Sequence, residues 1–86
     1  MAKEYGKLAK MTARQGNRPK AIAQFKEALK FDPELPQLHR DLGMILAEEG
    51  RIKEAIDSLQ TALKLDPKDK AVRKKLDELL PLLKNK

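Results

Sequence analysis

The residues best placed for chemistry are four basic side chains near the start of the sequence: Lys3, Lys7, Lys10 and Arg14. Their spacing of three and four residues puts them on one face of a helix. Such a face can simply be solvated, or it can bind acidic peptides, nucleic-acid phosphates or lipid phosphates by ion pairing. Nucleic acid is the weaker choice, because only 3% of the residues are aromatic and no aromatic platform accompanies the basic residues. Membrane binding is also disfavoured, because the periodicity indicates that the apolar side of this helix is buried against a second helix.

The other reactive residue types form no catalytic or metal-binding pattern. Cysteine is absent, and His39 is the only histidine, which we interpret as a partly buried structural residue. Adjacent carboxylates such as Glu48 and Glu49 point to different faces of a helix, which argues against paired acid–base catalysis. The sequence also has no glycine-rich phosphate loop. We therefore expect no enzyme activity, no cofactor and no metal.

The elements that position the basic residues follow from an internal repeat. Leu8 and Leu42 lie 34 positions apart, and many other residues match at the same offset. A fixed period of this length is typical of helical hairpins that stack to bury a shared core. The other matched segments are Ala13 with Ala47, Gly16 with Gly50, Ala21-Ile22 with Ala55-Ile56, Ala28-Leu29-Lys30 with Ala62-Leu63-Lys64, and Asp32-Pro33 with Asp66-Pro67.

Each copy of the pattern predicts two helices. In the first copy, a helix over about residues 3–15 carries an apolar stripe and stops at Gly16-Asn17, a turn pair that can also cap the next helix. That next helix has Pro19 in its first turn and ends at Asp32-Pro33. The second copy repeats this arrangement with breaks at Gly50 and Asp66-Pro67. The first stripe consists of Tyr5, Leu8, Ala9 and Thr12.

A fifth helix is expected from about Asp69, whose residue type suits an N-cap. Its two-sided character suits a helix that covers the end of a stack. Pro81 should kink or end it. The leucine-rich stretch over residues 79–83 is expected to pack against the fourth helix, with a dimer contact or docking to a continuation of the chain as the alternative. The expected apolar face consists of Val72, Leu76, Leu79, Leu80 and Leu83.

These matched residues resemble the tetratricopeptide repeat. Small residues at its close-packed positions match best, whereas several of its aromatic positions hold smaller or polar residues. The second copy supplies His39, Leu42-Gly43, Leu46, Ala55, Leu59, Ala62 and Pro67, and the first supplies Tyr5, Leu8-Ala9, Thr12, Ala21, Phe25, Ala28 and Pro33.

The resemblance implies an all-α fold: a right-handed helical-hairpin solenoid of two repeats plus a C-terminal capping helix, five helices in total. The expected single domain is 1–86, with repeats at 2–35 and 36–69 and the cap at 70–83. The resemblance also implies that the first helix of each pair lines a concave groove for a peptide or protein segment. The groove residues that we transfer onto this sequence for binding are Lys3, Lys7, Lys10, Arg14, Arg40, Met44 and Lys75.

Chaperone-binding members of the family hold a C-terminal carboxylate with basic and amide side chains. The corresponding places here hold Gly6, Lys10, Asp41, Ala71 and Lys75. Only Lys75 preserves that chemistry, and Asp41 would repel the carboxylate, so we do not expect chaperone tails as ligands.

The sequence thus predicts an adaptor that binds an acidic peptide or protein segment. The formal net charge of +6 favours acidic partners. No apolar run approaches the ~18 residues of a membrane span, so we expect a cytoplasmic protein. Two alternatives stay open: a self-assembly module whose ends stack on other copies as a homo-oligomer, or an idealised or truncated repeat with no native ligand.

Overall fold

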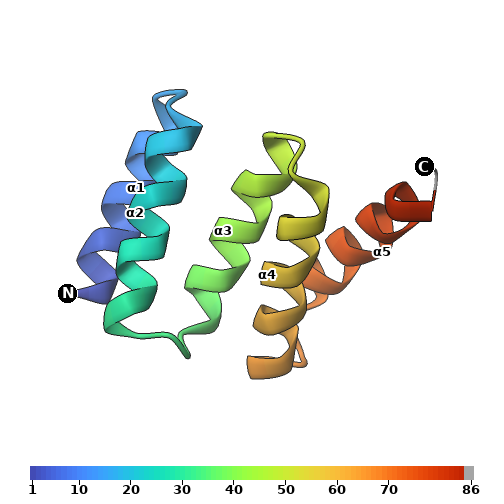
Figure 1. Ribbon diagram of the computed structural model, residues 1–86. Helices are drawn as coiled ribbons and strands as arrows, with labels where there is room; N and C mark the ends of the chain where they lie inside the picture. The colour runs from blue at the N-terminus through green and yellow to red at the C-terminus, as the bar shows by residue number, and fades with distance from the viewer. Residues whose placement is uncertain (85–86) are drawn as a thin grey trace.

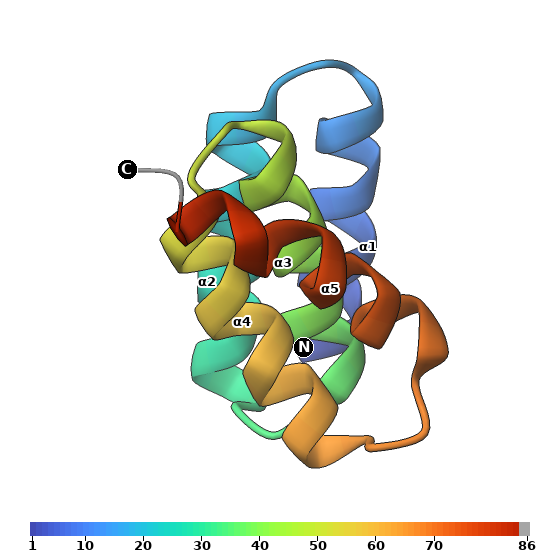
Figure 2. The ribbon, with the colours of Figure 1, turned by 90° about the vertical axis from the view of Figure 1, so that its right-hand side faces the viewer.

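The chain folds as two helical hairpins followed by a single helix (Figure 1). The computed structural model describes residues 1–84, and no strand occurs within that range. The hairpins stand side by side, and the last helix lies across the far side of the second hairpin (Figure 2). The predicted all-α solenoid of five helices is confirmed. The helices are α1 (Ala2–Arg14), α2 (Arg18–Phe31), α3 (Pro36–Glu48), α4 (Ile52–Leu65) and α5 (Lys70–Lys84).

The two hairpin turns are the same structure built twice. Gly16 and Gly50 adopt φ angles of +88° and +80°, a left-handed conformation that favours glycine. The amide after each glycine reaches back five residues, with Asn17 N donating to Thr12 O at 3.1 Å and Arg51 N to Leu46 O at 2.9 Å. This pattern satisfies the carbonyls at the end of the helix and turns the chain sharply. Asn17 also caps α2, since its Oδ1 accepts from Lys20 N at 3.3 Å.

The two Asp-Pro segments are turns, as predicted. Asp32 Oδ1 accepts a hydrogen bond from Glu34 N at 3.2 Å, and Asp66 Oδ1 accepts one from Lys68 N at 3.3 Å. Each aspartate therefore stabilises the turn that its own backbone begins. His39 supports the first turn, because its Nε2 lies 2.7 Å from Pro33 O. The half-buried His39 is thus structural, as expected.

The start of α5 and its expected extent over residues 70–83 match the structure, whereas one of the two effects expected of Pro81, ending the helix, does not occur. Asp69 Oδ1 accepts from Val72 N at 3.2 Å, which makes Asp69 the N-terminal cap of α5. Pro81 does not end the helix, since α5 continues to Lys84. The ring leaves only the carbonyl of Asp77 without its helical donor, and Asp77 is exposed, so water can satisfy that carbonyl.

Two of the predicted apolar stripes are only partly buried. In α1, Ala9 and Thr12 are buried, but Leu8 is 45% exposed. In α5, Val72, Leu76 and Leu79 are buried, whereas Leu80 and Leu83 are each 39% exposed. The reason is the same at both ends, because within residues 1–84 no helix covers the outer side of α1 or of α5.

Small residues let the helices of each hairpin approach closely. Gly43 in α3 shows this best, because a Cβ added there would lie 2.6 Å from Leu59 Cγ and 3.3 Å from the backbone oxygen of Ala55. Ala21, Ala28, Ala55 and Ala62 are likewise buried, at most 1% exposed. The predicted small positions are therefore where the helices pack.

We expect Gly43→Ala to lower the free energy of unfolding by about 1–2 kcal/mol. Overpacking against Leu59 costs about 1–3 kcal/mol, and the better helix propensity of alanine returns up to about 1 kcal/mol. Urea denaturation followed by circular dichroism measures the change. Gly6→Ala is the matched control, because its new Cβ would meet only the flexible end of Leu38, 2.9 Å away, which can move. An equal loss in both variants would contradict the close approach at Gly43.

Candidate binding groove

Two adjoining hollows lie between α1 and α3, and we call them together the α1–α3 groove. Their volumes are about 370 and 250 Å³. Lys10 and Asp41 line both hollows, which makes the groove continuous along the two helices. The first hollow is lined by Lys10, Ala13, Arg14, Phe25, Asp41, Met44, Ile45 and Glu48, and the second by Lys3, Gly6, Lys7, Lys10, Leu35, Gln37, Leu38, Arg40 and Asp41.

The groove brings together six of the seven residues transferred from the family resemblance. Lys3, Lys7 and Lys10 come from one face of α1, and Arg40 and Met44 come from the facing side of α3. Arg14 completes the set at the end of α1. Lys75 lies apart on α5, where its Nζ is 3.6 Å from Glu78 Oε1, and it lines neither hollow.

Two of the groove cations, Lys10 and Arg40, already pair with carboxylates of the protein. Lys10 Nζ lies 3.3 Å from Asp41 Oδ2, and Arg40 Nε lies 3.5 Å from Asp41 Oδ1. Arg40 Nη1 also lies 3.3 Å from Asp69 Oδ2. Both acidic side chains are recessed, at 18% exposed for Asp41 and 15% for Asp69, so solvent screens these pairs less than fully exposed ones.

The sequence showed that Asp41 is unsuited to binding a ligand carboxylate, but it did not predict that Asp69 pairs with Arg40. As an N-cap, Asp69 was recognisable from its place before the helix of residues 70–84. Its pairing with Arg40 joins α3 to the turn before α5, 29 residues away in sequence. No local pattern encodes such a contact. It follows that Arg40 helps to hold the capping helix in place as well as lining the groove.

The remaining groove cations are Lys3, Lys7 and Arg14. Within residues 1–84, none of the three lies within 4.0 Å of a carboxylate oxygen. Lys3 and Lys7 line one end of the groove and Arg14 lines the other. Positive charge that can pair with a ligand is therefore concentrated on the α1 wall.

The floor of the groove is apolar. Phe25 of α2 lines this floor and is fully buried in the core, while Met44 and Ile45 of α3 are half-buried. An extended segment lying here would bury its own apolar side chains against these residues. The groove thus offers an apolar strip with cations along one side.

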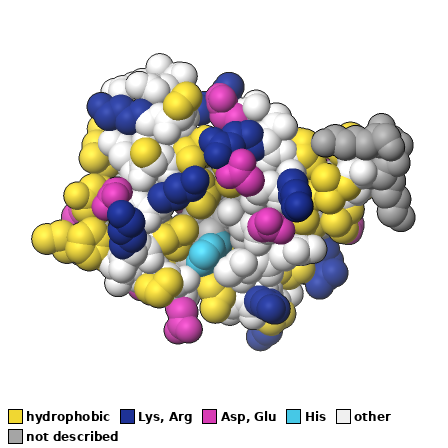
Figure 3. Space-filling view, viewed as in Figure 1, with side chains coloured by type: hydrophobic (Ala, Val, Ile, Leu, Met, Phe, Trp, Pro, Cys, Tyr) yellow, Lys and Arg dark blue, Asp and Glu magenta, His cyan; other side chains and the backbone are white. Residues whose placement is uncertain are grey.

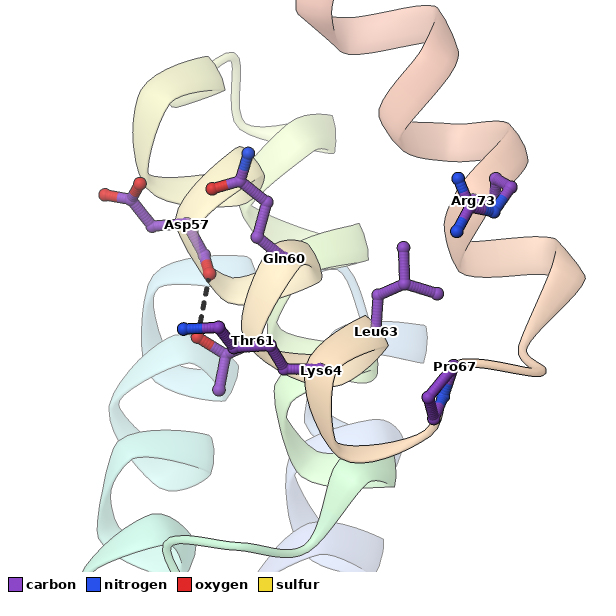
Figure 4. A pocket seen from close by; sticks show the side chains of 7 residues that line it. All are labelled: Asp57, Gln60, Thr61, Leu63, Lys64, Pro67 and Arg73. Atoms are coloured by element: carbon purple, nitrogen blue, oxygen red, sulfur yellow. Dashed lines mark hydrogen bonds between the residues drawn. The ribbon is translucent and has the colours of Figure 1, made fainter.

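A second, shallower hollow of about 570 Å³ lies between α4 and α5 (Figure 4). Asp57 lies at one side of it and Arg73 at the other, on separate helices. Thr61 Oγ1 donates to the backbone oxygen of Asp57 at 3.0 Å, which leaves this hydroxyl engaged with its own helix. These side chains do not converge on a common point, so we do not assign a site there.

The groups whose pKa values are shifted lie outside the groove. The N-terminal ammonium, 2.9 Å from Glu4 Oε1, lowers the pKa of Glu4 by hydrogen bonding. At the start of α4, the two hydrogen bonds of 2.8 Å between Arg51 and Glu54 raise the pKa of Arg51 and lower the pKa of Glu54. All three groups are at the surface, so their pKa values describe local ion pairs and give no indication of acid–base catalysis.

The described part of the chain contains neither a metal-binding cluster nor a helix that could span a membrane. No group of three or more His, Asp or Glu side chains in residues 1–84 is arranged to hold a metal ion. No helix in this range has the length and apolar character needed to cross a membrane.

Comparison with known proteins finds one family. A sequence profile described as "Tetratricopeptide repeat" matches residues 8–81. No curated protein sequence matches the chain significantly.

Solved structures share the fold at low sequence identity. A structure of MamA from Desulfovibrio magneticus RS-1, spanning its residue 41 to the end, superposes with a TM-score of 0.88 at 24% identity, over 96% of this chain and 47% of that one. The chain therefore spans about half the length of the MamA structure. A tetratricopeptide repeat domain protein from Salinibacter ruber superposes with a TM-score of 0.72 at 23% identity in its solution structure, over 95% of this chain and 82% of that one. Its crystal structure gives 0.71 at 23% identity, over 94% and 90%.

Proposed function

The chain belongs to the tetratricopeptide repeat family, and from that premise we propose that it is an adaptor whose α1–α3 groove binds an acidic segment of another protein. Members of this family generally act as protein-interaction scaffolds without catalytic activity. The residues that we assign to recognition are Lys3, Lys7 and Arg14 for charge and Met44 for apolar contact. We also propose that residues 2–35 and 36–69 are its two repeats and that residues 70–83 form the cap.

The observation that carries this proposal is the arrangement of charge around the groove. Lys3, Lys7 and Arg14 line it without carboxylate partners in the described part of the chain, beside an apolar floor that includes Phe25 and Met44. A ligand with carboxylates on one side and apolar groups on the other matches both features. Lys10 and Arg40 contribute less, because a ligand carboxylate must compete with Asp41 for them.

That competition provides a direct test. We expect Asp41→Asn to tighten the binding of a labelled peptide that alternates glutamate with leucine by about threefold, because the change frees Lys10 and removes one of the two carboxylates that pair with Arg40, while keeping the size of the side chain. Fluorescence anisotropy titrations measure the dissociation constant. A matched peptide with lysine in place of glutamate should bind weakly to both proteins.

Glu78→Gln is the matched control variant. It removes the carboxylate that pairs with Lys75 on α5, and it changes the net charge as Asp41→Asn does, but it lies outside the groove. We expect Glu78→Gln to leave the dissociation constant nearly unchanged. If the two variants tighten binding equally, the overall charge of the protein attracts the peptide and the groove assignment is wrong.

A further inference from the structure

The two hollows of the α1–α3 groove lie at opposite ends of the same two helices. The smaller one is lined mainly by the first halves of α1 and α3, and we call it the start hollow. The larger one is lined mainly by their second halves, and we call it the end hollow. A segment that lies along the groove therefore has one part in each hollow.

The start hollow is strongly positive. Among the described residues, Asp41 is the only carboxylate that lines it, and the cations are Lys3, Lys7, Lys10 and Arg40. Asp41 is already paired with Lys10 at 3.3 Å and with Arg40 at 3.5 Å. Lys3 and Lys7 have no carboxylate oxygen within 4.0 Å in residues 1–84. A carboxylate of a ligand is therefore attracted to this end of the groove.

The end hollow is balanced in charge. The cations Lys10 and Arg14 line it together with the carboxylates of Asp41 and Glu48. Glu48 is 56% exposed, and its Oε1 pairs at 3.3 Å with Arg18, which does not line the hollow. A ligand carboxylate that approaches Arg14 also approaches Glu48, and like charges repel. Acidic groups therefore gain less here than in the start hollow.

Apolar contact favours the end hollow instead. Half-buried Met44 and Ile45 line it together with the ring of Phe25. Its volume is about 370 Å³, whereas the start hollow, with Leu35 and Leu38 in its wall, has about 250 Å³. A bulky apolar side chain therefore finds more room and more apolar surface in the end hollow.

The ion pair between Lys10 and Asp41 marks the junction of the two hollows. Both residues line both hollows, and the pair joins α1 to α3. Along α1, the distance from the middle of Lys3 and Lys7 to Ala13 is roughly 12 Å, at about 1.5 Å of rise per residue. An extended chain covers that distance with about three or four residues. Ligand residues that cross the junction pass over the ion pair, where small side chains fit best.

The other side of the molecule shows no such separation of charge. Figure 3 shows the side on which α2 and α4 lie, and basic and acidic side chains are interspersed over it. The division into a positive end and a balanced end is thus a property of the groove and not of the surface in general.

We propose that the α1–α3 groove selects a partner segment whose acidic and apolar residues are separated along the chain. A bulky apolar side chain occupies the end hollow against Met44 and Ile45. Carboxylates about three or four residues away occupy the start hollow and pair with Lys3 and Lys7. This preference, which rests on the function proposed above, adds the order of the residues to the acidic character of the ligand.

The test compares three capped peptides of one composition. In two of them, three glycines separate a pair of leucines from a pair of glutamates, with either pair first, since an extended chain can lie in either direction. The third has the order Gly-Leu-Glu-Gly-Leu-Glu-Gly. We expect the tighter of the two separated peptides to bind about fivefold more tightly than the mixed one, because both of its glutamates reach the start hollow. Titrations followed by the amide signals of nitrogen-15 labelled protein measure the dissociation constants.

A nitroxide label at either end of the tighter peptide locates its two parts. A label at the leucine end should broaden the amide signals of Ala13 and Glu48. A label at the glutamate end should instead broaden those of Gly6 and Gln37. These four residues line the end hollow and the start hollow, respectively, so the readout does not depend on affinity.

A pair of protein variants tests the charge that sets the preference. Lys3→Gln combined with Lys7→Gln should remove the preference for the separated peptide, because the start hollow then loses its unpaired cations. The matched control, Lys20→Gln combined with Lys26→Gln on α2, changes the net charge equally but does not line the groove, and it should keep the preference.

The outcomes separate this proposal from the function on which it rests. Equal affinities of the separated and mixed peptides, or broadening at the same hollow by both labels, would overturn the separated order while leaving an adaptor for acidic segments in place. An equal loss of all three peptides in the Lys3 and Lys7 variant would do the same. If none of the three peptides binds the unmodified protein, the proposed function fails, and the separated order fails with it.

Discussion

Replacing Phe25 with alanine is expected to lower the free energy of unfolding by about 3–5 kcal/mol and to leave much of the protein unfolded at physiological temperature. Phe25 is fully buried, is the largest side chain in the core, and also forms part of the floor of the α1–α3 groove. A domain of 86 residues has a total stability of about 4–13 kcal/mol, so the loss is comparable to the lower end of that range.

The size of the loss follows from where Phe25 lies. It belongs to the core cluster that joins the two hairpins, with Ile22, Leu38 and Leu42. Its removal leaves a cavity that backbones held close by Ala9 and Ala21 cannot fill without moving. Thermal and urea denaturation followed by circular dichroism measure the change.

Phe31→Ala is the matched control for Phe25→Ala. It removes the same side chain from the same helix, but Phe31 is 53% exposed and stacks on the ring of Tyr5, with ring centroids 5.6 Å apart. We expect it to cost about 0.5–1.5 kcal/mol, the value of an aromatic pair. A loss at Phe31 equal to that at Phe25 would show that the core is not centred where the structure places it.

The repeat itself allowed most of the fold to be predicted, for a physical reason. A glycine that ends a helix, an Asp-Pro turn and an alanine between two helices are local requirements, and each leaves its residue type in the sequence at a fixed offset. Gly16 and Gly50 have matching φ angles, and Asp32 and Asp66 accept matching hydrogen bonds, because equal sequence makes equal local structure.

What the repeat could not predict is which neighbour each face has. Leu46 and Leu80 occupy the same position of the repeat pattern, on α3 and α5, but they are 2% and 39% exposed. The residue type is identical there, and the two differ because α3 is packed between α2 and α4, whereas α5 packs mainly on α4 within residues 1–84. The same limit explains Leu8, which the stripe in α1 predicted to be buried.

The sequence allowed only the total charge of the groove to be predicted, not which of its cations are paired. Counting basic residues on α1, α3 and α5 indicates a positive surface, but it does not reveal which cations face a carboxylate. Asp41 pairs with both Lys10 and Arg40, and Asp69 reaches Arg40 from a turn distant in sequence. Such pairings depend on side-chain directions in three dimensions. Because of these pairings, the groove cations that are left to bind a ligand lie on α1 and not on α3.

We expect the combined reversal of three charges of the α1 wall, Lys3→Glu, Lys7→Glu and Arg14→Glu, to weaken binding of the alternating glutamate–leucine peptide by at least about fivefold. Each exposed ion pair contributes about 0.2–1 kcal/mol, and reversal replaces attraction by repulsion at three positions, so the combined effect is about 1–4 kcal/mol. Because all three side chains are exposed, the variant should keep its helical circular dichroism signal. Binding of the unmodified protein should also weaken as salt is raised, and the variant should lose that salt dependence.

The matched control is Lys20→Glu, Lys26→Glu and Lys30→Glu on α2. These side chains line neither hollow of the groove, yet their reversal changes the net charge of the protein by the same amount. We expect the control to weaken binding by less than about threefold, since long-range attraction between exposed charges is largely screened at physiological salt. Equal losses in the two variants would show that net charge alone attracts acidic peptides. Full binding by the α1 variant would show that the ligand does not lie along the basic wall of the groove.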